Sequence, residues 1–202
     1  MGAPPAAAMV RVAHTAQLDP ADLADARALM DVAFGEPVSG EPVSDDDAFE
    51  DADWTHALGG MHALVRVDGL LVAHGSLVPR RLLLGSGPDA RSLRCGYVEA
   101  VATHPGHRRR GYAAAVMAAL EAFAPAYDVL ALGASDDGVP LYAARGWVPW
   151  RGPTSVLGPT GPRRTPDDDG SVFVLLGDPA PHTPPIDLGA PLACDWRDGD
   201  VW

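Results

Sequence analysis

The 202-residue chain has no lysine and no asparagine, and all 15 of its basic residues are arginines. Against them stand 27 acidic residues, so the formal net charge is −12 at pH 7. Nucleic-acid binding requires a basic surface that neutralises phosphates, and this charge therefore argues against a nucleic-acid partner. No apolar run approaches the roughly 18 residues of a membrane span, so we expect no membrane partner either.

Cysteine is scarce, with only Cys95 and Cys194 in the chain. A disulfide between them is one interpretation, but two separate thiols in an intracellular chain are the favoured one. No cysteine or histidine cluster has the spacing of a zinc site, so we expect no metal. Residues 1–8 lack the basic start and apolar core of a signal peptide, which favours a cytoplasmic protein.

The length and the hydrophobic content of 47% suit one domain with a substantial core. We expect a flexible lead over residues 1–9 and a single domain over residues 10–202. Proline and glycine break up residues 177–191, so this domain should end in an extended tail, with its regular structure closed by residue 176.

Hydrophobic periodicity and turn signals give the order of elements. An Asp19-Pro20 helix start and an Asp68-Gly69 hairpin turn are the strongest local signals. An antiparallel meander followed by a crossover helix predicts an α+β fold with a mixed, mostly antiparallel central sheet flanked by helices. Strands are expected at residues 10–14, 61–67, 70–84, 93–103, 129–132, 147–157 and 171–176, and helices at 19–35, 53–59, 113–123 and 139–145.

Acidic residues gather in three segments, residues 45–53, 167–169 and 195–200. Clustered carboxylates raise the local concentration of cations, so a polycationic ligand is one interpretation. Solvated surface charge that aids solubility is the other.

The run Arg108-Arg109-Arg110-Gly111-Tyr112-Ala113 lies between a predicted strand and an Ala-rich predicted helix. Backbone N–H groups at such a helix start converge on a phosphate, and arginines can neutralise further charge. An ordinary basic helix start would have the same composition. The spacing Arg108-x-x-Gly111-x-Ala113, however, resembles the acetyl-CoA pyrophosphate loop of the GNAT superfamily of N-acetyltransferases, which also shares the predicted order of elements.

This resemblance implies acetyl-CoA as the cofactor. The pyrophosphate of this cofactor would be held by Arg108, Arg109, Arg110, Gly111, Tyr112 and Ala113. The backbone of Val101 and Thr103 would hold the pantetheine arm.

Two residues are candidates for proton transfer. Glu99 lies in an otherwise apolar strand, where a carboxylate is costly unless it is paired or exposed; it would relay a proton from the substrate amine, or simply face outward at the sheet surface. Tyr142 could be a core aromatic. Its motif, Leu-Tyr-x-x-x-Gly-Trp, resembles the GNAT motif whose tyrosine is a general acid, and a phenol with a pKa of about 10 stays protonated at pH 7.

Longer segments are similar to one branch of this family, the aminoglycoside 2'-N-acetyltransferases. The resemblance implies direct acetyl transfer in a ternary complex to the 2'-amino group of a polycationic amino sugar, antibiotic resistance and a homodimer. Asp46 fits the first substrate-binding position nearly as well as Asp47, and Ala100 stands where a glycine is common. The similar segments are residues 58–64, 93–99, 141–159, 160–170 and 194–202, and the implied substrate-binding residues are Asp47, Glu99, Ala100, Asp168, Asp200 and the terminal carboxylate of Trp202.

Two other functions stay open. One is a GNAT enzyme for a different amine, such as a small polyamine, another amino sugar or a protein N-terminus. The other is a noncatalytic acyl-CoA-binding module, although a pure binder has no use for both Glu99 and Tyr142.

Overall fold

The computed structural model describes residues 9–35, 49–177 and 185–202. Contacts between Cα atoms divide the chain into two compact units. Two long strands, β3 (Leu70–Leu84) and β4 (Arg91–Thr103), contribute residues to both units. The first unit comprises Met1–Val78 and Glu99–Glu121, and the second comprises Pro79–Val98 and Ala122–Trp202.

The strands of the first unit follow the predicted hairpin. Strand β1 (Val10–His14) pairs antiparallel with β2 (Met61–Val67), and β2 pairs antiparallel with β3. Asp68 and Gly69 have φ of +50° and +84°, as the two central residues of a type I′ turn require. The end of β4 lies beside β3, where the His104 N–H donates to the Val72 carbonyl at 2.9 Å.

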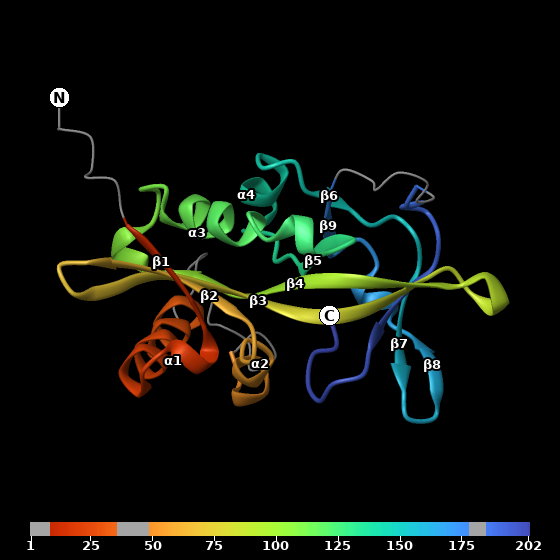
Figure 1. The fold of residues 1–202 in the computed structure, drawn as a ribbon, viewed down its shortest axis with the longest axis horizontal. Helices are drawn as coiled ribbons and strands as arrows, with labels where there is room; N and C mark the ends of the chain where they lie inside the picture. The colour runs from red at the N-terminus through yellow and green to blue at the C-terminus, as the bar shows by residue number, and fades with distance from the viewer. Residues whose placement is uncertain (1–8, 36–48, 178–184) are drawn as a thin grey trace. The chain divides into compact units, whose positions relative to one another are not determined.

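Three helices cover these strands. Helix α1 (Pro20–Phe34) begins as predicted: the Asp19 carboxylate accepts from the N–H of Asp22 at 2.8 Å, and proline occupies the first position. Helix α2 (Asp51–His56) is short, and α3 (Tyr112–Glu121) follows β4. Helices α1 and α2 lie on one face of β1–β3 and α3 lies on the opposite face (Figure 1).

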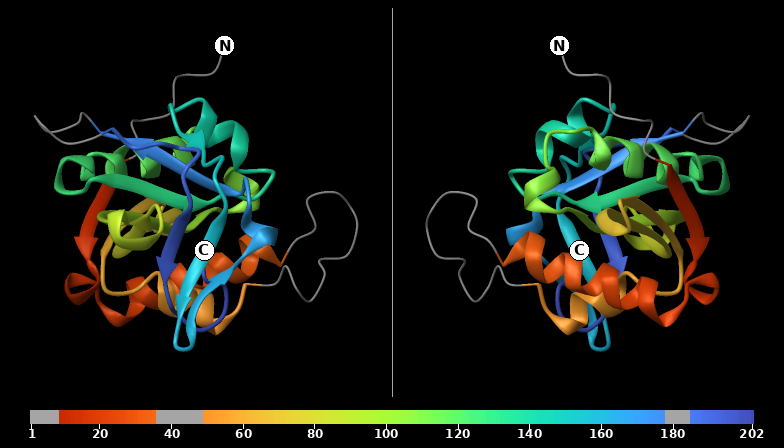
Figure 2. Two further views of the ribbon diagram at one scale, coloured as in Figure 1. Left: turned by 90° about the vertical axis from the view of Figure 1, so that its right-hand side faces the viewer. Right: turned by 90° about the vertical axis from the view of Figure 1, so that its left-hand side faces the viewer.

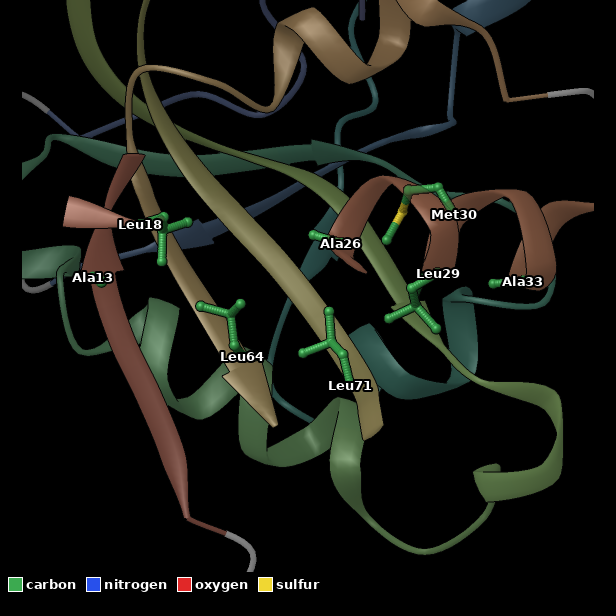
Figure 3. Close-up of a cluster of buried hydrophobic side chains, with 9 residues drawn as sticks. Ala13, Leu18, Ala26, Leu29, Met30, Ala33, Leu64 and Leu71 are labelled. Carbon is green, nitrogen blue, oxygen red and sulfur yellow. The ribbon is translucent and has the colours of Figure 1, made fainter. Parts of the chain in front are cut away.

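The face under α1 carries an apolar cluster of buried side chains. Figure 3 shows its side chains between the helix and the strands. On the other face, α3 buries Val116, Met117 and Leu120. The members of the α1 cluster are Ala13, Leu18, Ala26, Leu29, Met30, Ala33, Leu64, Leu71 and Ala102.

The second unit has the strand order β6-β9-β5-β4-β3-β10-β7-β8. The pairs β4–β5 and β10–β7 are parallel, whereas β5–β9, β6–β9, β7–β8 and β10–β3 are antiparallel, so the predicted mixed, mostly antiparallel sheet is confirmed. Figure 2 (left) shows β10 beside the β7–β8 hairpin. The remaining elements are β5 (Val129–Gly133), α4 (Val139–Ala143), β6 (Val148–Pro149), β7 (Thr154–Gly158), β8 (Gly161–Arg164), β9 (Val172–Leu176) and β10 (Leu192–Asp195).

The prediction that regular structure ends at residue 176 is wrong. Strand β10 follows the Pro- and Gly-rich segment and pairs with β3 on one side and β7 on the other. Its residues Leu192, Ala193 and Cys194 are all buried, so the strand shows no alternation that a sequence pattern could reveal. Strand β8 was also missed, because its Gly-Pro-Arg-Arg sequence lacks β-type residues.

The structure also bears on the expectations for the two cysteines and for membrane-spanning helices. Cys95 and Cys194 are both buried thiols, as the favoured interpretation held. Along the described ranges, no helix combines the length and apolar character that crossing a membrane requires.

We predict that Leu64→Ala destabilises the protein by about 2–5 kcal/mol, because it removes a buried side chain and leaves a cavity beneath α1. Leu70→Ala in the same hairpin is the matched control, since Leu70 is 49% exposed. Urea unfolding should separate the two variants. Equal effects of the two substitutions would contradict the assignment of Leu64 to the core.

Candidate functional site

The loop before α3 turns sharply and ends at the N-terminus of that helix. Arg109 and Gly111 both have positive φ, +61° and +84°, whereas Arg108 before them is extended. The first intrahelical bond runs from the Ala115 N–H to the Gly111 carbonyl at 3.0 Å. The N–H groups of the preceding turn therefore lack intrahelical acceptors, as in every α-helix. Positive helix-dipole charge adds to their attraction for a phosphate.

The three arginines of this loop have different surroundings. Arg108 Nη2 donates to the carbonyl of Ala33 at 3.1 Å, in the last turn of α1. Arg110 Nη2 donates to the Gly106 carbonyl at 3.3 Å, and the side chains of Arg109 and Arg110 are exposed. Arg108 thus ties the loop to a helix C-terminus, where a cation is favoured, and Arg109 and Arg110 are accessible to an anion.

Glu99 lies in β4 directly before a kink in the strand. Ala100 has φ of +50°, a left-handed conformation that is rare for a residue other than glycine and that interrupts the extended backbone. Glu99 and Ala100 are both half-buried. The sequence suggested an altered fit at Ala100, and the kink shows that an alanine here adopts a conformation to which glycine is better suited.

A chain of buried hydrogen bonds ends at this kink. Thr15 Oγ1 lies 2.8 Å from His62 Nε2, His62 Nδ1 lies 2.9 Å from His74 Nε2, and His74 Nδ1 lies 2.9 Å from the Ala100 carbonyl oxygen. Both histidines have no exposed surface. Burial, with a smaller contribution from His14, lowers the pKa of His62 to about 4. Burial also lowers the pKa of His74 to about 4.

Tyr142 lies on α4 in the second unit. Its side chain is buried, and its ring centroid lies 6.2 Å from that of Trp147. Burial raises the pKa of Tyr142 to about 12, so the phenol is protonated at every physiological pH.

The acidic residues near the C-terminus divide into two kinds. Asp168 has a raised pKa, first because it is partly buried and next because the carboxylate of Asp200 repels its charge. Asp169, its neighbour, is instead bound by Arg164 and by the N–H and hydroxyl of Thr154, which hold its pKa well below the usual range. Asp169 is therefore committed to the fold, whereas the carboxylate of Asp200 accepts from the N–H of Trp202 at 3.1 Å.

Trp202, the last residue, is fixed by a chain of hydrogen bonds. Its Nε1–H donates to Thr165 Oγ1 at 2.9 Å, the Thr165 hydroxyl lies 2.9 Å from Thr154 Oγ1, and Thr154 Oγ1 lies 2.8 Å from the Asp169 carboxylate. The indole is only 4% exposed. The indole therefore anchors the last residue, whose main chain carries the terminal carboxylate.

Two arginines hold the backbone of the same tail. Arg80 is buried on β3; its Nε donates to the Asp195 carboxylate at 2.9 Å, and its Nη2 donates to the carbonyls of Asp195 and Val201 at 3.0 and 2.9 Å. Arg197 donates to the Asp200 carbonyl and, at 2.9 Å, to an oxygen of the Trp202 carboxylate. One oxygen of that carboxylate therefore already has a cationic partner.

The structure thus places the predicted residues in two groups. Predicted Asp47 lies outside the described residues. Sequence reasoning missed His62, His74 and Arg80, although each is a polar residue within a buried apolar strand, the same signal that identified Glu99. The first unit contains Glu99, Ala100, Val101, Thr103 and the loop from Arg108 to Ala113, and the second contains Tyr142, Asp168, Asp200 and Trp202.

Comparisons with known proteins give one family. The model of the acetyltransferase (GNAT) family matches residues 25–147. The chain is also 47% identical over 194 residues to the aminoglycoside 2'-N-acetyltransferase of Mycolicibacterium fortuitum, and this match covers 95% of the chain and 91% of that protein.

Solved structures agree on the fold. A GCN5-related N-acetyltransferase of Rhodopseudomonas palustris is similar with a TM-score of 0.55 and 19% identity, over 85% of this chain and 96% of that one. Another, from Kribbella flavida, has a TM-score of 0.50 and 18% identity over 72% of this chain and 34% of that longer one. At these identities the likeness supports the fold alone, which is the predicted GNAT-type α+β fold.

We predict that acid destabilises the protein through the two buried histidines. Unfolded histidines have an ordinary pKa of 6.5, whereas His62 and His74 bind a proton in the folded state only near pH 4. Unfolding therefore takes up protons between these pH values, and the free energy of unfolding falls as the pH is lowered from 6.5 toward 4. At about pH 5.5 the loss should be about 1.4 kcal/mol for each histidine.

Urea unfolding at about pH 7.5 and about pH 5.5 measures this loss. The double variant His62→Leu/His74→Leu is the control, because it removes both titrating groups and should show a smaller loss. The same pH dependence in both proteins would contradict the prediction.

Proposed function

The chain belongs to the GNAT family of acetyltransferases, and we propose that it transfers the acetyl group of acetyl-CoA to the 2'-amino group of aminoglycosides. The observation that carries this proposal is the likeness, over almost the whole chain, to the Mycolicibacterium fortuitum enzyme. Direct transfer within a ternary complex is the mechanism we assign to it.

The residues of the first unit fit the cofactor. The N–H groups at the start of α3 and the exposed Arg109 and Arg110 suit a pyrophosphate, with Arg108, Gly111, Tyr112 and Ala113 shaping the loop around it. In the described part of the chain, the buried hydroxyl of Thr103 has no hydrogen-bond partner, which a bound molecule would supply. The backbone groups of Val101 and Thr103 would hold the pantetheine arm. Bound acetyl-CoA supplies the acetyl group as an activated thioester.

Glu99 takes the role of general base in this proposal. An ammonium group cannot attack a carbonyl until it loses a proton, and a carboxylate can accept that proton directly or through water. The kink at Ala100 re-aims the strand immediately after Glu99, as bulges near active sites do.

Tyr142 takes the role of hydrogen-bond donor to the leaving sulfur. Its phenol keeps its proton because burial raises its pKa to about 12. A thiol has a pKa of about 8.5, so complete proton transfer from this phenol to a thiolate is unfavourable. We therefore assign Tyr142 first to stabilising the leaving sulfur by a hydrogen bond, in the manner of an oxyanion donor.

The carboxylates of the tail suit a polycationic substrate. Repulsion between Asp168 and Asp200 contributes to the raised pKa of Asp168, and an ammonium group bound beside them would relieve that repulsion. The Trp202 carboxylate offers a further oxygen at a rigid position. Asp47, Glu99 and Ala100 complete the substrate contacts of the proposal.

We also infer, from the family likeness alone, that the enzyme is a homodimer that acts in the cytoplasm. Acetylation of the 2'-amino group removes a positive charge from the drug. It would thereby confer aminoglycoside resistance.

The experiment that tests the function compares two aminoglycosides, one with a 2'-amino group and one with a 2'-hydroxyl group. We expect thiol release from acetyl-CoA with the amine and none with the alcohol, because only the amine presents the acceptor nitrogen. A thiol-reactive dye measures the rate. Release with both would contradict the assigned position, and release with neither would turn the assignment toward a different amine.

We predict that Glu99→Gln lowers kcat by about 100-fold or more, the usual contribution of a general base. Tyr142→Phe should lower kcat by about tenfold through loss of one hydrogen bond to the leaving group. Steady-state kinetics at saturating substrates measures both effects. Glu121→Gln and Tyr127→Phe are matched controls. Wild-type kcat in either test variant would remove that residue from the mechanism.

A further inference from the structure

The left-handed residue in β4 needs an explanation, because nothing in its own side chain favours that conformation. Ala100 carries a Cβ that crowds the backbone at φ of +50°. Such conformations persist only where the surrounding structure holds them, and they gather at functional sites. The groups that hold this residue come from strand β3.

Two side chains of β3 contact the two carbonyls that flank the Cα of Ala100. His74 Nδ1 lies 2.9 Å from the Ala100 carbonyl oxygen, and Ser76 Oγ lies 3.5 Å from the Glu99 carbonyl oxygen. These carbonyls belong to the peptide groups on either side of Ala100. Holding both of them restricts rotation about the backbone bonds of Ala100, and it thereby fixes the direction in which the chain leaves Glu99.

The positions of the hydrogen atoms along the chain of histidines can be inferred from the Ala100 carbonyl at its end. A carbonyl only accepts, so His74 Nδ1 carries a hydrogen and donates it. In neutral His74 the other nitrogen, Nε2, accepts from the Nδ1–H of His62. The Nε2 of His62 is then an acceptor, and the single hydroxyl hydrogen of Thr15 is shared between this nitrogen at 2.8 Å and the Gly60 carbonyl at 3.2 Å. Every buried nitrogen thus has a partner in a chain without net charge. At the β4 end the chain stops at the Ala100 carbonyl, which accepts a hydrogen bond but cannot pass a proton on, and this favours a role in geometry over proton transport.

We propose that His74, supported by His62 and Thr15, is a positioning residue for acetyl transfer: its bond to the Ala100 carbonyl holds the kink that orients Glu99. The inference rests on the proposed function, because it assigns Glu99 as the base. It explains why two histidines occupy fully buried places on adjacent strands, where apolar residues would pack without any demand for hydrogen bonds.

The test compares His74→Leu, which removes the donor, with His74→Asn, whose side-chain amide places a donor near the position of Nδ1. We expect His74→Leu to lower kcat by about tenfold or more while the KM for acetyl-CoA changes by less than about twofold, since misplaced catalytic groups are costly. His74→Asn should retain kcat within about threefold of wild type. The double variant His62→Leu/His74→Leu leaves no histidine nitrogen unpaired, and it provides a folded protein if His74→Leu alone is unstable.

A mutant cycle with Glu99→Gln separates positioning from a structural role. If His74 acts through Glu99, adding His74→Leu to Glu99→Gln should lower kcat by less than about twofold, because the base is already absent. Two results would overturn the role of His74 without touching the proposed function. One is that His74→Leu lowers kcat as much in the Glu99→Gln background as in the wild type. The other is a wild-type kcat in both His74→Leu and His62→Leu/His74→Leu. A wild-type enzyme with no turnover of 2'-amino aminoglycosides would instead overturn the proposed function.

Discussion

Buried polar groups need hydrogen-bond partners, and this need organises both units of the chain. Strand β3 carries the buried polar side chains concerned, His74 in the first unit and Arg80 in the second. In the first unit, His74 satisfies its Nδ1–H with the carbonyl of Ala100, next to the proposed base. In the second unit, Arg80 donates from Nε and Nη2 to Asp195 and to backbone carbonyls of the tail that ends in Trp202. In each case a buried polar side chain, which gains little from the hydrophobic effect, holds the backbone beside a candidate functional group.

Acidic residues that look alike in the sequence have separate tasks in the structure. Asp169 and Asp195 accept from arginines and anchor the fold, with Asp169 also ending the hydroxyl chain from Trp202. Asp168 and Asp200 repel each other, and that repulsion is the property a cation-binding site needs. A cluster of carboxylates therefore indicates affinity for cations only through those carboxylates that are not paired with an arginine of the fold. Of these four aspartates, Asp168 and Asp200 are the two that remain.

Local signals in the sequence predicted much of the fold. The Asp19-Pro20 helix start, the Asp68-Gly69 turn and the buried run of β5 each depend on neighbouring residues, and each is found as expected. Strand β10 could not be predicted, because its four residues become a strand only by pairing with β3 and β7, far away in the sequence. The same limit applies to the site: a motif identified Tyr142, but the contacts of His74 and Arg80 depend on tertiary structure. The resemblance to a known family supplied the roles that spacing alone left open.

We propose that this GNAT enzyme modifies one particular nitrogen, and the position of the acetyl group in the product would show which nitrogen reacts. An aminoglycoside that carries several amino groups, including one at the 2' position, would be acetylated to completion and examined by two-dimensional NMR. We expect a single product with the acetyl group on the 2' nitrogen. Acetylation at another nitrogen, or a mixture of positions, would contradict it.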